Sequence, residues 1–278
     1  FVAVRGETHD GHDFISAAID RGAAAVICER NGFSSGRATK ITVADSRLAL
    51  AITAANFHGH PSRQLKVIGV TGTNGKSTTT ALLGHICASA GLKTFTGGNL
   101  GLPLCERALG PKGDVVVCEL SSFQLEGIAS MRCQGAAYLN LTPDHIDRYP
   151  SHEAYGLAKR RIFMNQSPTD VAVINAHSKD AMALSEGIAG RRLTFGHGTP
   201  VPGGIRHYAR KLVLNLGSTD SREAEESYEV KAKSLRGAHN LENAMAAVLL
   251  ARTVGVPHEK VQAGLDSYPG LPHRLEFV

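Results

Sequence analysis

The residues with the clearest chemical potential lie at 71–78 and read Thr-Gly-Thr-Asn-Gly-Lys-Ser-Thr. They follow an apolar, β-branched run at 66–70 and precede a stretch with helical spacing at 79–90. Glycines in such a turn let backbone N–H groups converge on an anion at the positive end of a helix. Lys76 could then reach the β- and γ-phosphates of a nucleotide, and the Ser77 hydroxyl could bind Mg²⁺.

The spacing departs from the strict Walker pattern at one position. The pattern G-x-x-x-x-G-K-[ST] would place its first glycine at Val70, whereas the first usable glycine is Gly72. An ordinary strand-to-helix turn is therefore the alternative, but the register of the later residues favours a nucleoside triphosphate site. The residues expected to contact the nucleotide are Gly72, Thr73, Asn74, Gly75, Lys76, Ser77 and Thr78.

A second metal ligand is expected at the end of a neighbouring strand, because ligands gather at the carboxyl edge of parallel sheets. The apolar run at 115–120 contains Glu119 near its end. This carboxylate should emerge at the sheet edge beside the phosphate loop. A helix cap is the alternative, and the residue alone does not decide between the two.

Strands alternate with helices along the chain, which predicts a parallel α/β sheet. The first part is expected to hold strands at 1–4, 23–28 and 41–43 and helices at 14–22 and 48–58. The second part is expected to hold strands at 66–70, 115–120, 136–141 and 171–175, helices at 79–90, 240–254 and 258–267, and an antiparallel edge at 203–230. We expect a smaller, partial α/β domain at 1–64 and a P-loop-containing, mostly parallel, doubly wound domain at 65–278.

Composition excludes several other classes of protein. The net charge is +5, but Lys and Arg are spread along the chain and aromatics make up 5%, so we expect no nucleic-acid partner. The five cysteines form no CxxC pair and are expected to be core residues. No apolar stretch has the length of a membrane span, so we expect no membrane partner and a cytoplasmic location.

Several segments, in order, resemble the Mur ligases, the ATP-dependent enzymes that build the peptide of bacterial cell-wall precursors. They lie at 71–78, 97–104, 119–126, 140–149, 237–240 and 270–274. The segments Gly-Gly-Asn-Leu-Gly-Leu-Pro-Leu at 97–104 and Glu-Leu-Ser-Ser-Phe-Gln-Leu-Glu at 119–126 are similar to those of the members that add D-glutamate. So is the segment at 140–149.

The resemblance implies ATP and two Mg²⁺ ions as cofactors. Ser77 and Glu119 would bind the first ion, and His145 would bind the second near the acceptor carboxylate. Lys159 falls where the family carries a carbamylated lysine, which has reacted with CO₂ to become a carboxylate-like metal ligand. Apart from the resemblance, Lys159 is expected to be a solvated helix residue. The catalytic residues implied are thus Lys76, Glu119, His145 and Lys159.

Further residues are implied to contact the substrates. Asn240 and Arg274 match positions that contact the nucleotide, and Asn99, Ser121 and Gln124 match positions near the muramoyl peptide. Ordinary alternatives are a helix cap for Asn240, a surface ion pair for Arg274 and a turn for Asn99.

The implied function is the addition of D-glutamate to UDP-N-acetylmuramoyl-L-alanine through an acyl phosphate, by a monomer in the bacterial cytoplasm. The partners would be a UDP-N-acetylmuramoyl peptide and a free amino acid. The first sixty residues instead resemble the tripeptide synthetases, which makes addition of diaminopimelate or lysine the alternative. A nucleotide-binding module without ligase activity is a third hypothesis. We expect the family's C-terminal, amino-acid-binding domain to be absent from these 278 residues, and we therefore expect the isolated chain to ligate poorly or not at all.

Overall fold

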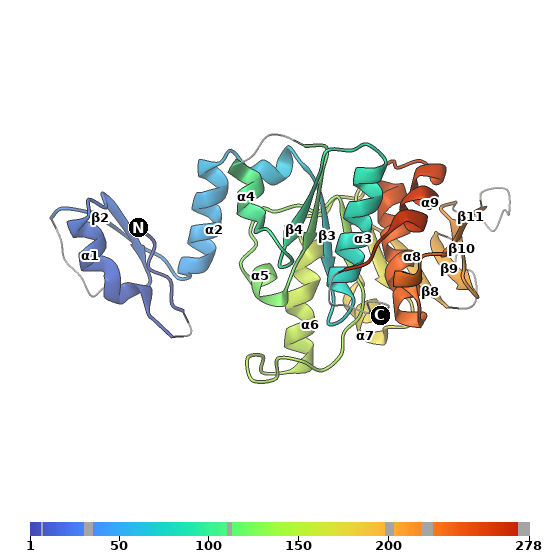
Figure 1. Ribbon diagram of the computed structural model, residues 1–278. Helices are drawn as coiled ribbons and strands as arrows, with labels where there is room; N and C mark the ends of the chain where they lie inside the picture. The colour runs from blue at the N-terminus through green and yellow to red at the C-terminus, as the bar shows by residue number, and fades with distance from the viewer. Residues whose placement is uncertain (7, 31–35, 110–112, 198–202, 218–224, 272–278) are drawn as a thin grey trace. The chain divides into compact units, whose positions relative to one another are not determined.

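The computed structural model describes residues 1–6, 8–30, 36–109, 113–197, 203–217 and 225–271 (Figure 1). The chain folds into two compact units, Phe1–Pro61 with Gly127–Ser130 and Ser62–Glu126 with Met131–Val278. Among the described residues, no helix combines the length and the apolar character needed to cross a membrane.

The first unit contains a parallel pair of strands, β1 (Ala25–Cys28) and β2 (Thr39–Thr42). Its helices are a 3-10 turn at Gly11–Phe14, α1 (Ile15–Asp20) and α2 (Ser46–Phe57). Its small core consists of Ala3, Ile15, Ile19, Val26 and Cys28. In place of the strand expected at 1–4, the structure has a single β-bridge between Val2 and Ile27, so the predicted strand was too long.

The second unit is built on a sheet whose described strands run in the order β11-β10-β9-β8-β7-β6-β3-β5-β4. Their bounds are β3 (Lys66–Thr71), β4 (Thr94–Gly98), β5 (Val115–Glu119), β6 (Gly135–Tyr138), β7 (Val171–Asn175), β8 (Arg191–His197), β9 (Gly204–Tyr208), β10 (Lys211–Asn215) and β11 (Glu225–Glu229). Neighbours from β4 through β9 are parallel, and the last two strands join antiparallel. The predicted fold class and the antiparallel edge are thereby confirmed.

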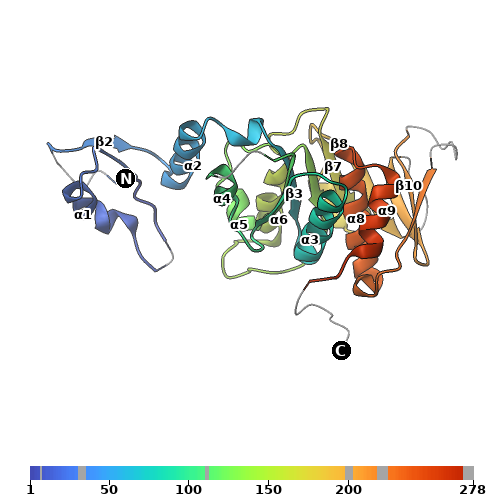
Figure 2. The same ribbon diagram turned by 45° about the horizontal axis from the view of Figure 1, so that its top comes forward.

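Helices cover both faces of this sheet. Their bounds are α3 (Lys76–Ser89), α4 (Leu104–Leu109), α5 (Ser122–Glu126), α6 (His152–Arg160), α7 (Lys179–Leu184), α8 (Ala238–Thr253) and α9 (His258–Ser267), with 3-10 turns at Pro61–Arg63, Arg161–Phe163 and Lys233–Leu235. Helices α3, α8 and α9 pack together over one face, against a core that includes Ile68 and Val70 (Figures 1 and 2). Gly69, between them, faces the other side of the sheet, where a Cβ atom would meet Ile162 in the 3-10 turn that follows α6.

Two predicted boundaries were wrong in ways that matter for the site. The helix expected at 79–90 begins at Lys76, because Gly75 adopts a left-handed φ of 82° and turns the chain directly into the first helical residue. The strand expected at 136–141 ends at Tyr138. The following residues leave the sheet at its carboxyl edge, beside the end of β3.

Candidate nucleotide-binding site

The loop between β3 and α3 has the geometry of an anion site. The first N–H groups of an α-helix have no partner within the helix, and here they lie next to the glycine-rich turn. Only glycine suits position 75. Its φ is left-handed, and a Cβ atom there would lie 2.2 Å from Oδ1 of Asn243 on α8. Glycine at position 75 is therefore required both by the backbone conformation and by the neighbouring side chain of Asn243.

Lys76 folds back over the loop that precedes it. Its Nζ donates hydrogen bonds to the carbonyl oxygens of Gly72 at 3.0 Å and Thr73 at 2.8 Å. The charge thus lies above the turn where the phosphates are expected. Ser77, the next helical residue, is buried, with 6% of its surface exposed.

Glu119 ends β5, in register with Val70 of β3, and is 3% exposed. Its Oε1 accepts a hydrogen bond from Nδ2 of Asn99 at 2.9 Å, but its Oε2 has no hydrogen-bond partner among the described residues. A buried carboxylate oxygen without a partner is unfavourable unless a cation or donor reaches it. Helix α5 begins three residues later, at Ser122, so Glu119 is not a helix cap.

Lys159 lies on α6 and is 1% exposed, so the solvated position expected from the sequence alone is wrong. Its Nζ donates to the carbonyl of Gly72 at 2.8 Å and lies 4.5 Å from the centre of the Tyr155 ring. Burial lowers the pKa of Lys159 to about 7, and the charge of Lys76 adds to this, whereas Asp144 and Glu119 act in the opposite direction. An amine in this state is uncharged for part of the time near neutral pH.

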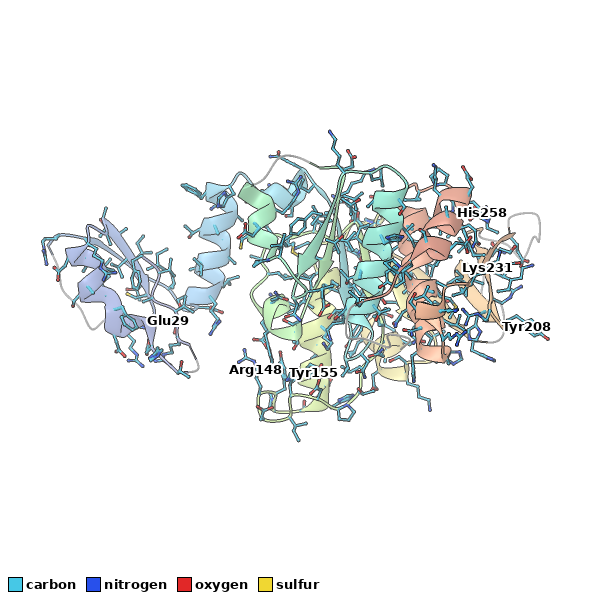
Figure 3. All side chains as sticks on the ribbon, viewed as in Figure 1. Glu29, Arg148, Tyr155, Tyr208, Lys231 and His258 are labelled. Atoms are coloured by element: carbon cyan, nitrogen blue, oxygen red, sulfur yellow. The ribbon has the colours of Figure 1, made fainter. Side chains whose placement is uncertain are left out.

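His145 lies on the loop after β6 with a left-handed φ of 51°, a strained conformation that is uncommon outside glycine. Its ring centre is 5.7 Å from that of Tyr155 and 4.8 Å from that of Phe123. Tyr155, which is labelled in Figure 3, therefore contacts both His145 and Lys159. This tyrosine, on the same helical face as Lys159, was not singled out from the sequence, although its spacing of four residues was available.

The three residues matched to the muramoyl peptide lie at the same sheet edge. Asn99 contacts Glu119 twice, since its backbone N–H also donates to the Glu119 carbonyl at 2.9 Å. Ser121 and Gln124 bond each other at the start of α5: Gln124 Oε1 accepts from the Ser121 N–H at 2.9 Å, and Ser121 Oγ accepts from the Gln124 N–H at 3.3 Å. This is a capping box.

Asn240 is buried within the first turn of α8, whose N-cap is Gly237, so the helix-cap alternative is wrong. Its Nδ2 donates to the Arg236 carbonyl at 2.9 Å, and its Oδ1 accepts from Asn243 at 3.2 Å. Asn243 is the residue that faces Gly75, so Asn240 is one side chain away from the phosphate loop. Arg274 lies outside the described residues.

A buried strand, a glycine-rich turn and a helix that begins with lysine and serine define a nucleotide-binding domain of the P-loop class. Two family models match the chain: the Mur ligase middle domain over residues 70–251, and the Mur ligase family, catalytic domain, over residues 1–58. The chain belongs to the Mur ligase family, as its ordered segments predicted.

Curated relatives agree with this assignment. The UDP-N-acetylmuramoylalanine–D-glutamate ligase of Anaeromyxobacter dehalogenans is 52% identical over 229 residues, which are 81% of this chain and 48% of the relative. The ligase of the same name from Myxococcus xanthus is 54% identical over 216 residues, which are 76% of this chain and 47% of the relative. The chain therefore spans about half the length of these relatives.

Solved structures match along the whole chain. A crystal structure of MurF from Acinetobacter baumannii has a TM-score of 0.67 and 26% identity, and it covers 100% of this chain and 61% of that one. A UDP-N-acetylmuramoyl-L-alanyl-D-glutamate–2,6-diaminopimelate ligase has a TM-score of 0.76 with the same coverage. Its identity of 23% supports the fold alone.

Proposed function

We propose that this chain is the ATP-binding part of a ligase that joins D-glutamate to UDP-N-acetylmuramoyl-L-alanine. The central observation is that the side-chain nitrogens of Lys76 and Lys159 converge on the Gly72 carbonyl, at the sheet edge where buried Glu119 keeps an unpaired oxygen. Identities of 52% and 54% to relatives named as D-glutamate ligases support this choice of amino acid. We assign residues 65–278 to ATP binding and residues 1–64 to part of a UDP-sugar-binding domain.

The chemistry suits a site dominated by cations. A carboxylate resists attack by an amine, because an oxide-like group would have to leave. Transfer of the γ-phosphoryl group to the acceptor carboxylate forms a C–O–P linkage and breaks the bond between the γ-phosphorus and ADP. The amine of D-glutamate then attacks the acyl carbon, loses a proton and displaces phosphate. The first step brings two anions together, so the charge of Lys76 lowers the barrier by spreading the developing charge.

Ser77 and Glu119 would hold a Mg²⁺ ion, which supplies positive charge to the phosphates when bound. The unpaired Oε2 of Glu119 fits this role, since a cation would satisfy it. In the part of the chain that the structure describes, no three His, Cys, Asp or Glu side chains gather into a metal cluster. Phosphate oxygens and water would therefore complete the coordination, as is common for Mg²⁺.

We assign a second ion to His145 and to a carbamylated Lys159. Carbamylation requires an uncharged amine, and the burial that lowers the pKa of Lys159 to about 7 provides one. We assign Asn99, Ser121 and Gln124 to the muramoyl peptide, and Asn240 and Arg274 to the nucleotide. The loop residues 72–78 would surround the phosphates.

The direct test uses the full-length protein that the gene encodes, including any residues before or after these 278. UDP-N-acetylmuramoyl-L-alanine and the corresponding dipeptide are supplied separately with ATP, Mg²⁺ and each candidate amino acid. We expect phosphate release only with the first acceptor and D-glutamate. Release only with the dipeptide and diaminopimelate or lysine would favour the tripeptide synthetase, to which the first sixty residues point. Nucleotide binding without release in any mixture would indicate a module without ligase activity.

The carbamate has its own test. Lys159→Ala should be inactive, and a short-chain carboxylate such as acetate should restore part of the activity by occupying the vacated position. Lys76→Ala is the matched control, because acetate cannot replace its positive charge. Restoration of neither variant, or of both equally, would count against a carbamate at Lys159.

A further inference from the structure

One side chain, that of Asn140, connects the phosphate loop by hydrogen bonds to the segment that follows the neighbouring strand β6. Asn140 follows β6 by two residues, and its Oδ1 accepts hydrogen bonds from the N–H groups of Thr73 at 3.0 Å and Asn74 at 2.9 Å. Its Nδ2 donates to the Asn74 carbonyl at 3.1 Å. The Asn140 backbone carbonyl also accepts from the Thr73 N–H at 3.1 Å. One amide group thus satisfies two donors and one acceptor of the loop.

A second connection lies next to the first. The Thr73 hydroxyl donates to the Thr142 carbonyl at 3.2 Å and accepts from the Thr142 N–H at 3.0 Å. Residues 140–142 therefore follow the phosphate loop from one side with both backbone and side-chain groups. The same segment continues to His145, whose ring packs against Tyr155.

These bonds restrict a turn that would otherwise be free to move. Gly72 and Gly75 both adopt positive φ, at 153° and 82°, and glycine loses more conformational freedom on ordering than other residues. The bonds also occupy the N–H groups of Thr73 and Asn74. These two N–H groups are therefore bonded within the protein, while the positive end of the α3 dipole would still attract an anion.

We propose that Asn140 is a positioning residue that holds the phosphate loop in its nucleotide-binding shape before the nucleotide arrives. This inference rests on the proposed function, because it assumes that the loop binds a nucleotide. Binding should be tighter because the entropy of ordering the loop is already lost. The same hydrogen bonds hold residues 140–142, the start of the segment that leads to His145. A change in the shape of the phosphate loop should therefore also shift His145.

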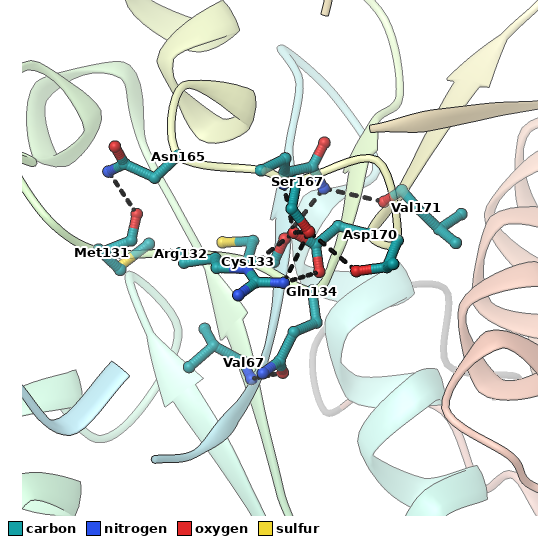
Figure 4. A network of polar contacts seen from close by, with 11 residues as sticks. Val67, Met131, Arg132, Cys133, Gln134, Asn165, Ser167, Asp170 and Val171 are labelled. Atoms are coloured by element: carbon teal, nitrogen blue, oxygen red, sulfur yellow. Dashed lines mark hydrogen bonds and ion pairs between the residues drawn. The ribbon is translucent and has the colours of Figure 1, made fainter. Parts of the chain in front are cut away.

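The chain contains a matched control on the same two strands. Gln134 lies just before β6, and its Oε1 accepts from the N–H of Val67 on β3 at 3.0 Å (Figure 4). It is the same kind of bond between the same strands, at the end of the sheet away from the loop. Asn140→Ala removes three side-chain hydrogen bonds and Gln134→Ala removes one bond of the same kind, and only Asn140 borders the proposed site.

The experiment measures MgADP affinity by calorimetry and amide hydrogen exchange over residues 72–75 in the protein without nucleotide. We expect Asn140→Ala to weaken MgADP binding roughly tenfold to a hundredfold, the effect of ordering one or two loop residues anew. It should also speed exchange in the loop. Gln134→Ala should lower thermal stability, by less than Asn140→Ala because one bond is lost in place of three, and should leave MgADP affinity and loop exchange unchanged.

A third variant separates positioning from general stability. Asn140→Asp keeps an acceptor for the two N–H groups but places a negative charge beside the phosphates. Slow exchange should be preserved, while MgADP binding falls at least as far as in Asn140→Ala. Wild-type affinity in both Asn140 variants, or unchanged loop exchange in Asn140→Ala, would overturn the proposal. Failure of the wild-type protein to bind MgADP would instead overturn the proposed function, and the exchange data would still decide whether Asn140 holds the loop.

Discussion

Glu119 and Asp170 are both 3% exposed and lie at opposite ends of the same sheet, yet their surroundings differ. Asp170 precedes β7 and accepts two hydrogen bonds from Arg132 at 2.8 Å each, together with bonds from the N–H and hydroxyl of Ser167 at 2.6 and 3.0 Å (Figure 4). Glu119 ends β5; its carboxylate accepts one bond from Asn99 and keeps a second oxygen without a partner among the described residues.

The difference distinguishes a buried carboxylate whose partners all come from the protein from one that still lacks a partner. Burial alone would raise the pKa of Asp170, but the hydrogen bonds from Arg132 and Ser167 outweigh it and the pKa is lowered. Both oxygens of the Asp170 carboxylate have hydrogen-bond donors from the protein, so this group needs no ligand. Glu119 is equally buried but has fewer hydrogen-bond partners, so a cation would supply the partner that its second oxygen lacks. One end of the sheet therefore stabilises the fold, and we propose that the other end binds a cation.

Removal of the charge at Glu119 should give the largest effect. Glu119→Gln keeps the size of the side chain but gives up most of its attraction for a cation. We expect ligase turnover to fall roughly a hundredfold to a thousandfold, because a metal contributes several kcal/mol to transition-state charge stabilisation. The free energy of unfolding should stay the same or rise, since a buried charge is removed. Phosphate release and thermal unfolding measure the two quantities, and a large loss of stability would contradict the comparison.

The reciprocal variant is Asp170→Asn. It should lower the free energy of unfolding by about 2–3 kcal/mol, less than the roughly 3–5 kcal/mol of a fully buried pair, because the Arg132 side chain is 38% exposed. MgADP affinity should not change. Asp20→Asn is the control, since its pair with Arg37 is largely exposed and should contribute less than about 1 kcal/mol.

The same variant has a defined pH dependence. The pKa of Asp170 is lower in the folded protein than in the unfolded chain, so its contribution is fully present above the unfolded value of about 4. It is lost as the pH falls through the folded pKa. The difference in unfolding free energy between wild type and Asp170→Asn should therefore be constant near neutrality and shrink below about pH 4. A difference that grows in acid would reverse the sign of the interaction.

Lys159 is expected to oppose stability in the absence of CO₂. Its folded pKa of about 7 lies below its unfolded value, so the unfolded chain binds more protons between the two, and stability rises with pH across that range. Lys159→Met should raise the free energy of unfolding on the order of 2 kcal/mol at pH 7 and should gain nothing above about pH 10.5, while activity is lost. Chemical unfolding in CO₂-free buffer at several pH values measures this, and a destabilised variant at pH 7 would contradict it.

Substitution of one serine at each end of the sheet, Ser167 near Asp170 and Ser121 near Glu119, should give the smallest effects. Ser167→Ala removes a hydroxyl bonded to Asp170 and Arg132 and should cost about 1 kcal/mol of stability without changing turnover. Ser121→Ala removes a cap of α5 and should lower stability by about 1 kcal/mol or less, but should also raise the KM for the acceptor severalfold. Equal effects of the two substitutions on KM would remove the distinction between the two ends of the sheet.

The sequence was informative where local pattern decides structure. β-Branched runs such as that at β7 predicted strands directly, and the glycine-rich loop predicted its own turn. Strand β4 was not predicted, because Thr-Phe-Thr-Gly-Gly contains little apolar character and only one of its residues is buried. The burial of Lys159 was also invisible, since a lysine on a short helix is usually solvated and only tertiary packing on the phosphate loop encloses it.

Asn140 shows why part of the site could not be predicted from the sequence. Its residue type favours a turn after a strand, and that local preference gave no sign of a partner 66 positions earlier in the chain. Parallel pairing of β6 with β3 brings the two strand ends together, and only this register places the amide on the loop. Contacts set by strand order were therefore the part that the residues alone did not reveal.

The fit of Gly75 against Asn243 has a consequence for how this loop can evolve or be redesigned. A new side chain at position 75 would meet two independent obstacles, the left-handed backbone and the neighbouring amide on α8. A smaller residue at 243 would remove only the second obstacle and would also take away a hydrogen-bond partner of Thr79 and Asn240. Libraries that vary this loop should therefore recover glycine at 75 on nearly every functional background. Positions 73 and 74 should accept more residue types, because Asn140 bonds only their backbone groups, and proline alone would remove one of those N–H donors.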